Sequence, residues 1–186
     1  MKNSNVDYQK KIITIPNILS VVRLCLIPVI VWLYLGQKDY IMTGIFVLFS
    51  GLTDIVDGYI ARKFNMISDV GKVLDPVADK ATQAVVLILL ALSFPLMLIP
   101  ICVLAVKEIF MLITGYMIIK KCDIVLGADW HGKAATVMLS ITMALHLFWH
   151  EIDPIVSIIS IILSTGMLLL TTILYAKRNF EYLLKK

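Results

Sequence analysis

Long apolar runs separated by short polar segments dominate the sequence. A transmembrane helix needs about 20 consecutive, mostly apolar residues, and six stretches reach or approach that length. They lie near residues 16–35, 40–61, 73–94, 96–119, 133–149 and 154–176. Their connections are short except around 62–72 and 120–132, and we find no internal repeat or low-complexity linker. The pattern predicts an all-α fold, with one domain over residues 1–186 that forms a polytopic membrane protein with six transmembrane helices.

The segment before the first run, Tyr8 to Thr14, mixes Lys10 and Lys11 with isoleucines. Two interpretations stay open: a short amphipathic helix on the membrane surface, or a basic tail on the side where positive charge collects. The first apolar run carries no Ala-x-Ala cleavage signal, so we expect no removable signal peptide.

Composition strengthens the membrane interpretation. Hydrophobic residues make up 60% of the 186 residues and the mean hydropathy is +0.91, whereas soluble domains are about 45–50% apolar. The net charge of +4 comes from basic residues spread through the chain, so we expect membrane lipids and no nucleic acid as partners. Cys25, Cys102 and Cys122 form no Cys-x-x-Cys motif, and we interpret them as buried small hydrophobes.

Basic residues mark one side of the membrane. Six spans place both termini on the same side, and 12 of the 17 Lys and Arg residues fall at those ends, whereas the opposite ends hold only Lys38. Cytoplasmic loops carry an excess of Lys and Arg. We therefore expect a multi-pass protein of the cell membrane, with both termini and the 62–72 loop in the cytoplasm. The residues behind this expectation are Lys2, Lys10, Lys11, Arg62, Lys63, Lys72, Lys120, Lys121, Lys177, Arg178, Lys185 and Lys186.

Four carboxylates interrupt the apolar pattern where the second and third runs meet. A charged side chain at the centre of a membrane helix costs about 2.5–3.5 kcal/mol, so four at regular spacing indicate a functional site. At about 100° per residue, the acidic and small residues of each helix share one stripe, and the antiparallel helices bring both stripes together near the cytoplasmic surface. The stripes are Asp54, Asp57, Gly58 and Ala61 in the second helix, and Gly71, Asp75 and Asp79 in the third.

Carboxylates in this arrangement favour a divalent cation. Their oxygens are the ligands that Mg²⁺, Mn²⁺ and Ca²⁺ prefer, and four facing carboxylates repel one another unless a cation or proton intervenes. A pair of ions would also clamp a pyrophosphate, and Arg62 is placed to pair with a phosphate. Small residues would let such a ligand approach, although the glycines alone also fit ordinary helix packing. Pro76 either begins a helix capped by Asp75 or lies in the first turns of a longer one.

The acidic stretch resembles the complete signature of the CDP-alcohol phosphotransferase family, with every fixed position and both spacings in agreement. In this sequence it reads Asp54-x-x-Asp57-Gly58-x-x-Ala61-Arg62-x₈-Gly71-x₃-Asp75-x₃-Asp79. The resemblance covers most of the chain and is strongest to the bacterial phosphatidylglycerophosphate synthases. Their first span is similar to Pro16-Asn17 followed by Arg23, and their third is similar to 74–80.

Members of that family transfer a phosphatidyl or similar group from a CDP-linked donor to an alcohol and release CMP. They are usually six-helix homodimers whose site opens to the cytosol. The resemblance therefore implies a phospholipid-biosynthesis transferase that uses CDP-diacylglycerol and two divalent cations, Mg²⁺ or Mn²⁺. It implies metal ligation by Asp54, Asp57, Asp75 and Asp79, general-base catalysis by Asp79, and donor binding by Gly58, Ala61, Arg62, Gly71 and Asn17.

A second group of polar residues resembles the part of phosphatidylglycerophosphate synthases that receives the acceptor. Lys107-Glu108 is similar to an Arg-Glu pair, and 132–136 is similar to a Gly-Lys-x-Lys-Thr segment. Lys107 and Lys133 are the acceptor-binding candidates, and His131 would add a donor or a proton shuttle. Structural roles stay open for both lysines: an ion pair with Glu108 for Lys107, and snorkelling at a helix end for Lys133.

The chain departs from that pattern at two positions where the pattern has a cationic side chain. Ala135 replaces the second lysine, and 114–116 occupies the place of a further arginine. Glycerol 3-phosphate remains the leading acceptor, giving phosphatidylglycerophosphate. Phosphatidylglycerol, the acceptor of cardiolipin synthases with this fold, is the alternative because it needs less positive charge.

Other classes of protein also place acids in a membrane. An ion transporter is the main alternative from a different class, but transporters often show internal repeats and charges near the midplane, whereas these acids lie in one hairpin. Intramembrane prenyltransferases use two separated acidic motifs, and this chain has one. A non-catalytic relative of the same fold is the third alternative, although the signature is complete.

Overall fold

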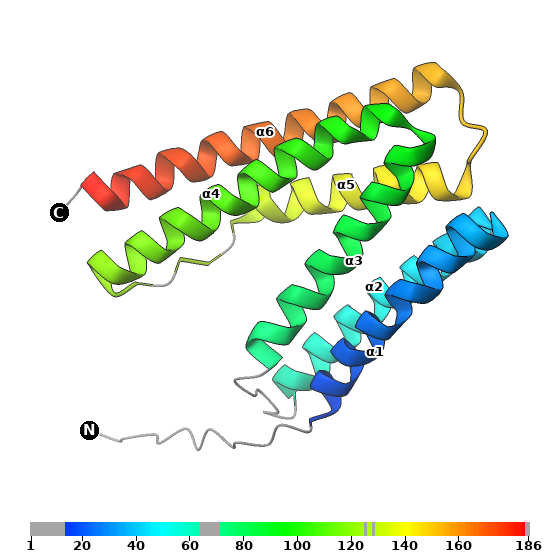
Figure 1. Ribbon diagram of the computed structural model, residues 1–186. Helices are drawn as coiled ribbons and strands as arrows, with labels where there is room; N and C mark the ends of the chain where they lie inside the picture. Colours follow the sequence, from blue (N-terminus) through cyan, green and yellow to red (C-terminus); the bar gives the residue numbers. More distant parts are fainter. Residues whose placement is uncertain (1–13, 64–70, 125, 128, 185–186) are drawn as a thin grey trace. The chain divides into compact units, whose positions relative to one another are not determined.

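The computed structural model describes residues 14–63, 71–124, 126–127 and 129–184, and all regular elements in these ranges are helices (Figure 1). The prediction of an all-α fold is confirmed. Six long helices coincide with the six predicted runs, while a π-helical turn (η1) extends the first and a 3₁₀ turn (η2) precedes the fourth. The elements are α1 Ile15–Val31, η1 Trp32–Gln37, α2 Tyr40–Lys63, α3 Gly71–Ser93, η2 Pro95–Met97, α4 Leu98–Cys122, α5 Trp130–Phe148 and α6 Pro154–Leu184.

Four of these helical segments are long and apolar enough to cross a membrane: Pro16–Gln37, Leu74–Ser93, Pro95–Lys121 and Pro154–Leu184. Among the described residues, α2 contributes a shorter apolar stretch, Tyr40–Val56. The chain is therefore an all-α membrane protein, while the number of six spans stays a prediction.

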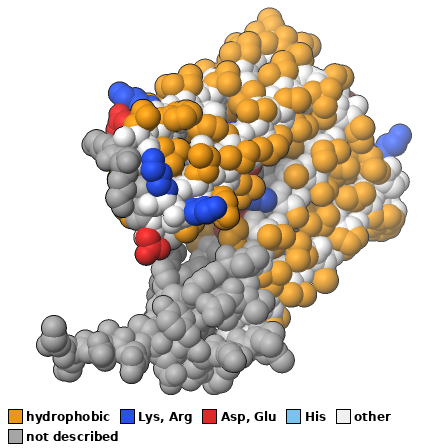
Figure 2. All heavy atoms as spheres, turned by 60° about the vertical axis from the view of Figure 1, so that its left-hand side comes forward, with side chains coloured by type: hydrophobic (Ala, Val, Ile, Leu, Met, Phe, Trp, Pro, Cys, Tyr) orange, Lys and Arg blue, Asp and Glu red, His pale blue; other side chains and the backbone are white. Residues whose placement is uncertain are grey.

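Many large apolar side chains lie on the outside of the helices, and the buried interior holds polar side chains as well as apolar ones. Ile55 is 68% exposed and Leu112 is 73% exposed, whereas Ser20, His146 and Thr171 are 0% exposed. Figure 2 shows hydrophobic side chains over most of the described surface in view. Lipid is as apolar as these side chains, so helix contacts in a membrane rely on packing and polar groups instead. This distribution is the one that a bilayer requires.

The same distribution corrects one prediction about the cysteines. Cys25 and Cys102 are free thiols on the exposed surface, so the predicted burial of these two residues is wrong. In a membrane helix an apolar run faces lipid as readily as protein, and apolar character alone does not indicate burial. The side chain of Cys122 lies outside the described residues.

The ends of the helices follow from local sequence. Thr14 Oγ1 accepts a hydrogen bond from the Asn17 N–H (3.4 Å) and caps α1, while the predicted interfacial segment before Thr14 lies outside the described residues. Because α3 begins at Gly71, Pro76 lies inside the helix rather than at its first position. Of the two placements expected for Pro76, the structure has the one in the first turns of a longer helix, with Asp79 one turn after Asp75.

The chain divides into two compact units, Met1–Leu89 and Leu90–Lys186. In the first, α1 packs along α2; in the second, α4 and α5 each pack along α6 (Figure 1). The first unit carries the predicted carboxylate stripes, and the second carries the predicted acceptor residues.

Candidate active site

The carboxylates of the signature lie on α2 and α3, as the helical spacing predicts. Asp54 is on α2 with 44% of its side chain exposed. On α3, Asp75 is half-buried and Asp79, one turn further, is exposed. The small residues Gly58 and Gly71 are half-buried and buried, respectively. Three further signature residues belong to α2 but have side chains outside the described part of the structure: Asp57, Ala61 and Arg62.

Helix α1 reaches both described stripes through two polar side chains. Arg23, only 1% exposed, donates from Nη1 to Oδ1 of Asp54 at 2.7 Å. The Ser20 hydroxyl, fully buried one turn earlier, donates to Oδ1 of Asp75, with the Pro16 carbonyl at 3.0 Å as a second acceptor. The first helix therefore contacts one carboxylate of α2 and one of α3.

Asn17, the weakest of the donor-site candidates, lies on the same polar face of α1 and is 5% exposed. With Ser20 and Arg23 it forms a stripe at intervals of three residues, which places all three on one side of the helix. The signature does not include Ser20 or Arg23, and no role was predicted for either. Their signal in the sequence was three polar residues at helical spacing in an otherwise apolar run.

The fit of these residues to divalent ions rests on the chemistry of their oxygens. Arg23 and Ser20 engage only Oδ1 of Asp54 and of Asp75, so each carboxylate keeps a second oxygen for a cation. Within the described residues, no three His, Cys, Asp or Glu side chains gather as a metal-binding group. The predicted metal-binding group also includes Asp57, whose side chain lies outside the described residues. The predicted metal site remains a proposal.

The predicted acceptor residues all belong to the second unit, in different surroundings. Lys107 on α4 is 6% exposed and its Nζ lies 3.2 Å from Oε1 of Glu108, so the predicted ion pair is present. Lys133, in the first turn of α5, is exposed. His131 is 9% exposed, and its Nε2 lies 3.3 Å from Oδ2 of Asp129. Among the described residues, no polar contact joins Lys107 to Lys133 or His131.

The start of α5 is fastened to α6 by three residues spaced along one face of α6. Thr171 Oγ1 donates to the His131 carbonyl (3.2 Å), and the Tyr175 hydroxyl accepts from the Asp129 N–H (3.0 Å). Arg178 Nη1 donates to Asp129 Oδ2 (2.6 Å). These contacts fix the start of α5, where Lys133 lies. They could not be predicted from local spacing, because the partners lie 40 to 49 residues apart in the chain.

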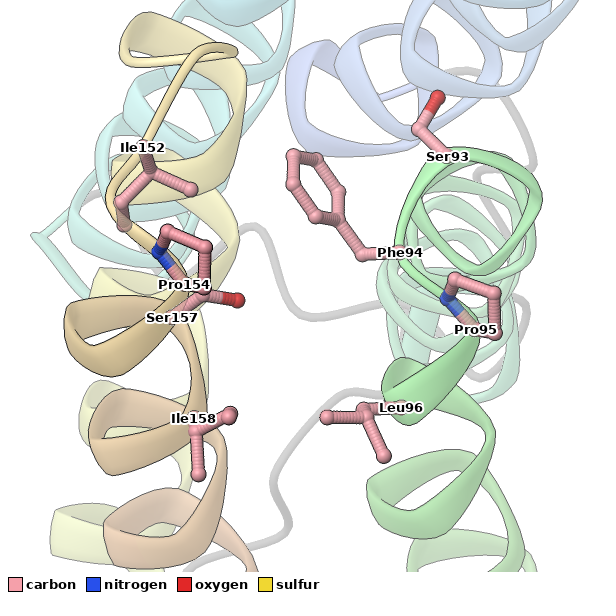
Figure 3. A pocket seen from close by; sticks show the side chains of 8 residues that line it. All are labelled: Ser93, Phe94, Pro95, Leu96, Ile152, Pro154, Ser157 and Ile158. Carbon is pink, nitrogen blue, oxygen red and sulfur yellow. The ribbon is translucent and has the colours of Figure 1, made fainter.

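A small cavity lies at the other end of α6. It measures about 210 Å³ and its lining includes Phe94 and Pro95 on one side and Pro154 and Ser157 on the other (Figure 3). Ser157 Oγ lies 2.9 Å from Nε2 of His146, whose Nδ1 lies 2.8 Å from the Thr142 carbonyl. The lining contains no charged side chain, so this cavity has none of the chemistry that phosphate groups require.

Comparison with known proteins agrees with the signature. The family description CDP-alcohol phosphatidyltransferase matches residues 13–174. The chain is similar to the CDP-diacylglycerol–glycerol-3-phosphate 3-phosphatidyltransferase of Aquifex aeolicus, with 29% identity over 178 residues, which is 92% of this chain and 99% of that protein. It is 46% identical over 79 residues to the protein of the same name from Rickettsia bellii, covering 41% of this chain and 43% of the relative.

Relatives with a different name also match. A cardiolipin synthase (CMP-forming) / mitochondrial hydrolase fusion protein of Schizosaccharomyces pombe is 46% identical over 84 residues, which is 45% of this chain and 14% of that protein. The chain thus spans well under two thirds of some relatives and nearly all of another. The signature, the helical membrane fold and a match over most of the sequence agree: the chain belongs to the CDP-alcohol phosphatidyltransferase family, whose members are transferases that use CDP-alcohol donors and alcohol acceptors.

Proposed function

We propose that this protein transfers a phosphatidyl group from CDP-diacylglycerol to an alcohol and releases CMP. The observation that carries the proposal is the complete signature, with Asp54 on α2 and Asp75 and Asp79 on α3. A membrane protein that carries these acidic residues between long apolar segments suits a donor that has a diphosphate headgroup and two acyl chains.

The reaction begins when the carboxylate of Asp79, which is exposed, takes the proton from the acceptor hydroxyl. The resulting oxygen attacks the β-phosphorus of the donor, the bond to the α-phosphate oxygen breaks, and CMP leaves with that electron pair. Gly58, Ala61 and Gly71 leave room for the nucleotide, while Arg62 pairs with the diphosphate and Asn17 borders the donor. Phosphoryl transfer depends mainly on positioning and charge neutralisation, which these residues supply.

Divalent cations complete the site in this proposal. Members of the family use divalent metals, and Asp54, Asp57, Asp75 and Asp79 are the residues that would hold two Mg²⁺ or Mn²⁺ ions. Bound there, such ions neutralise charge on the phosphates. The proposal places the site on the cytoplasmic side and retains the homodimer expected from the resemblance.

Glycerol 3-phosphate is the leading acceptor, supported by the similarity to the Aquifex aeolicus protein over nearly the full length of both chains. One observation favours phosphatidylglycerol instead. Lys107 is buried against Glu108, Ala135 is fully buried, and Thr114 is buried under Asn179. These positions offer little charge to a phosphate dianion.

A panel of acceptors tests the proposal. Purified protein receives CDP-diacylglycerol and Mg²⁺ or Mn²⁺ with glycerol 3-phosphate, phosphatidylglycerol, inositol phosphate or serine, and CMP is measured. We expect CMP with glycerol 3-phosphate, and CMP with phosphatidylglycerol alone would identify the alternative. No CMP with any acceptor would contradict the transferase proposal and favour the alternative of an ion transporter. An ion transporter would show cation flux in proteoliposomes.

A further inference from the structure

The buried polar stripe of α1 offers an inference beyond the signature. Arg23 is one of the least exposed of the described residues, at 1%, yet it carries a permanent charge, and Ser20 is fully buried. A charged group is rarely retained inside a membrane protein without a functional reason. Arg23 points to Asp54 and Ser20 to Asp75, and both partners are predicted metal ligands.

We propose that Arg23 and Ser20 are positioning residues that orient the carboxylates of Asp54 and Asp75 for divalent cations. Each donates to one oxygen of its carboxylate, Oδ1, which fixes how that carboxylate is turned and leaves Oδ2 for a cation. The contact joins α1 to α2 at Asp54 and α1 to α3 at Asp75, so one helix sets the orientation of one ligand on each side of the site. This inference rests on the proposed function, because it assigns the two residues to the metal site of that reaction.

Charge and orientation make opposite predictions for Arg23. If only its charge mattered, the guanidinium would oppose a nearby cation, and removing it would tighten metal binding. If orientation matters, any loss of the planar donor group weakens binding, even when a positive charge is kept. Lys is charged but lacks the fixed fork of donors that Arg presents to a carboxylate. Arg23→Lys and Arg23→Gln together therefore separate the two effects.

Two variants control for the loss of a buried hydroxyl and of an arginine that pairs with a carboxylate. Ser164 on α6 is fully buried like Ser20, but its hydroxyl donates only to the Ile161 carbonyl of its own helix (3.1 Å). Arg178 pairs with Asp129 in the second unit as Arg23 pairs with Asp54 in the first. Ser164→Ala and Arg178→Gln therefore remove similar groups from places remote in sequence from the signature.

The experiment measures Mn²⁺ affinity of the full-length protein in detergent by electron paramagnetic resonance of the free ion, with and without CMP. Loss of a residue that orients a metal ligand typically weakens metal binding about 10–100-fold, and we expect this for Ser20→Ala, Arg23→Lys and Arg23→Gln. The two control variants should stay within about twofold of wild type. Thermal unfolding without metal verifies that each variant is folded, and Ser20→Ala, which removes one oxygen, keeps the test informative if the Arg23 variants unfold.

Unchanged Mn²⁺ affinity in the folded Ser20→Ala and Arg23→Lys variants would overturn the inference while CMP release by wild type upholds the proposed function. Tighter binding in Arg23→Gln would overturn the orienting role of Arg23. If wild type itself binds no Mn²⁺ and releases no CMP, the proposed function fails and the inference fails with it.

Discussion

Asp79 is the single side chain on which the proposed chemistry depends most. It is exposed one turn beyond Asp75 on α3, so a hydroxyl substrate can approach it. Asp79→Asn keeps the size of the side chain but removes the base. General-base catalysis contributes about 10²–10⁴-fold to the rate. We expect the rate of CMP release to fall at least about 100-fold, while the melting temperature stays close to that of wild type. Retained turnover in the asparagine variant would exclude Asp79 as the base.

Gly132 is a residue where a single methyl group should matter. A Cβ at position 132 would overlap the hydroxyl of Tyr175. Tyr175 is 3% exposed, and its hydroxyl accepts a hydrogen bond from the Asp129 N–H. Overpacking typically costs about 1–3 kcal/mol, so Gly132→Ala should lower the melting temperature in detergent. Gly115 has open space around it, and Gly115→Ala should raise stability by up to about 1 kcal/mol. Partial rescue of Gly132→Ala by Tyr175→Phe would confirm the clash, and equal melting temperatures for both alanine variants would contradict it.

Residues that the sequence could identify differ in kind from those it could not. The carboxylate stripes follow from spacing within one helix, which depends only on the 3.6-residue period. The contacts of Ser20 and Arg23 depend on how α1 is placed against α2 and α3, which spacing along α1 does not determine. His146 illustrates the same limit: it is fully buried and lies 2.9 Å from the hydroxyl of Ser157 on another helix, which the spacing along α5 does not predict.

Helices α5 and α6 are joined by polar contacts rather than by apolar packing alone. His146 on α5 bridges the Thr142 carbonyl and the Ser157 hydroxyl of α6, and Phe94 lies edge-on to its ring at 4.7 Å between centroids. In a bilayer such hydrogen bonds are worth about 0.6 kcal/mol on average and up to about 1.7. A double-mutant cycle with His146→Leu and Ser157→Ala should give a coupling energy in this range. Strictly additive effects on the free energy of unfolding would show that the two side chains act independently.

The length of α6 shows where apolar pattern and tertiary contact diverge. The predicted run ends near 176, but the helix continues to Leu184. The added turns hold Asn179, which is 1% exposed and donates to Thr114 Oγ1 of α4 at 2.7 Å. Lys121 Nζ also donates to the Leu183 carbonyl (2.6 Å). Hydropathy detects the part of a helix that meets lipid, whereas polar contacts with α4 stabilise the rest, so the end of α6 was not predictable from apolar residues.

For the whole molecule, the distribution of Lys and Arg predicts how the chain lies in the membrane. With six spans, the C-terminus and the 62–72 loop share the cytoplasm, and the turn between α5 and α6 at 149–153 faces the opposite side. Four basic residues lie at the predicted cytoplasmic ends, namely Lys120, Lys121, Lys177 and Arg178. The charged residues of the turn at 149–153 are the acidic Glu151 and Asp153, which flank no Lys or Arg. Positive charge is retained in the cytoplasm and acidic residues have little influence, so the orientation should be uniform.

Alkaline phosphatase fusions in a bacterial host measure this orientation, because the enzyme folds only outside the cytoplasm. Fusion after residue 186 should be inactive, and insertion in the turn at 149–153 should be active. Insertion in the 62–72 loop serves as the internal control and should be inactive like the C-terminal fusion. Activity at the C-terminus together with inactivity at 149–153 would invert the predicted orientation. Activity at both positions would mean that α6 does not cross the bilayer. The C-terminus would then not lie on the same side of the membrane as the predicted site.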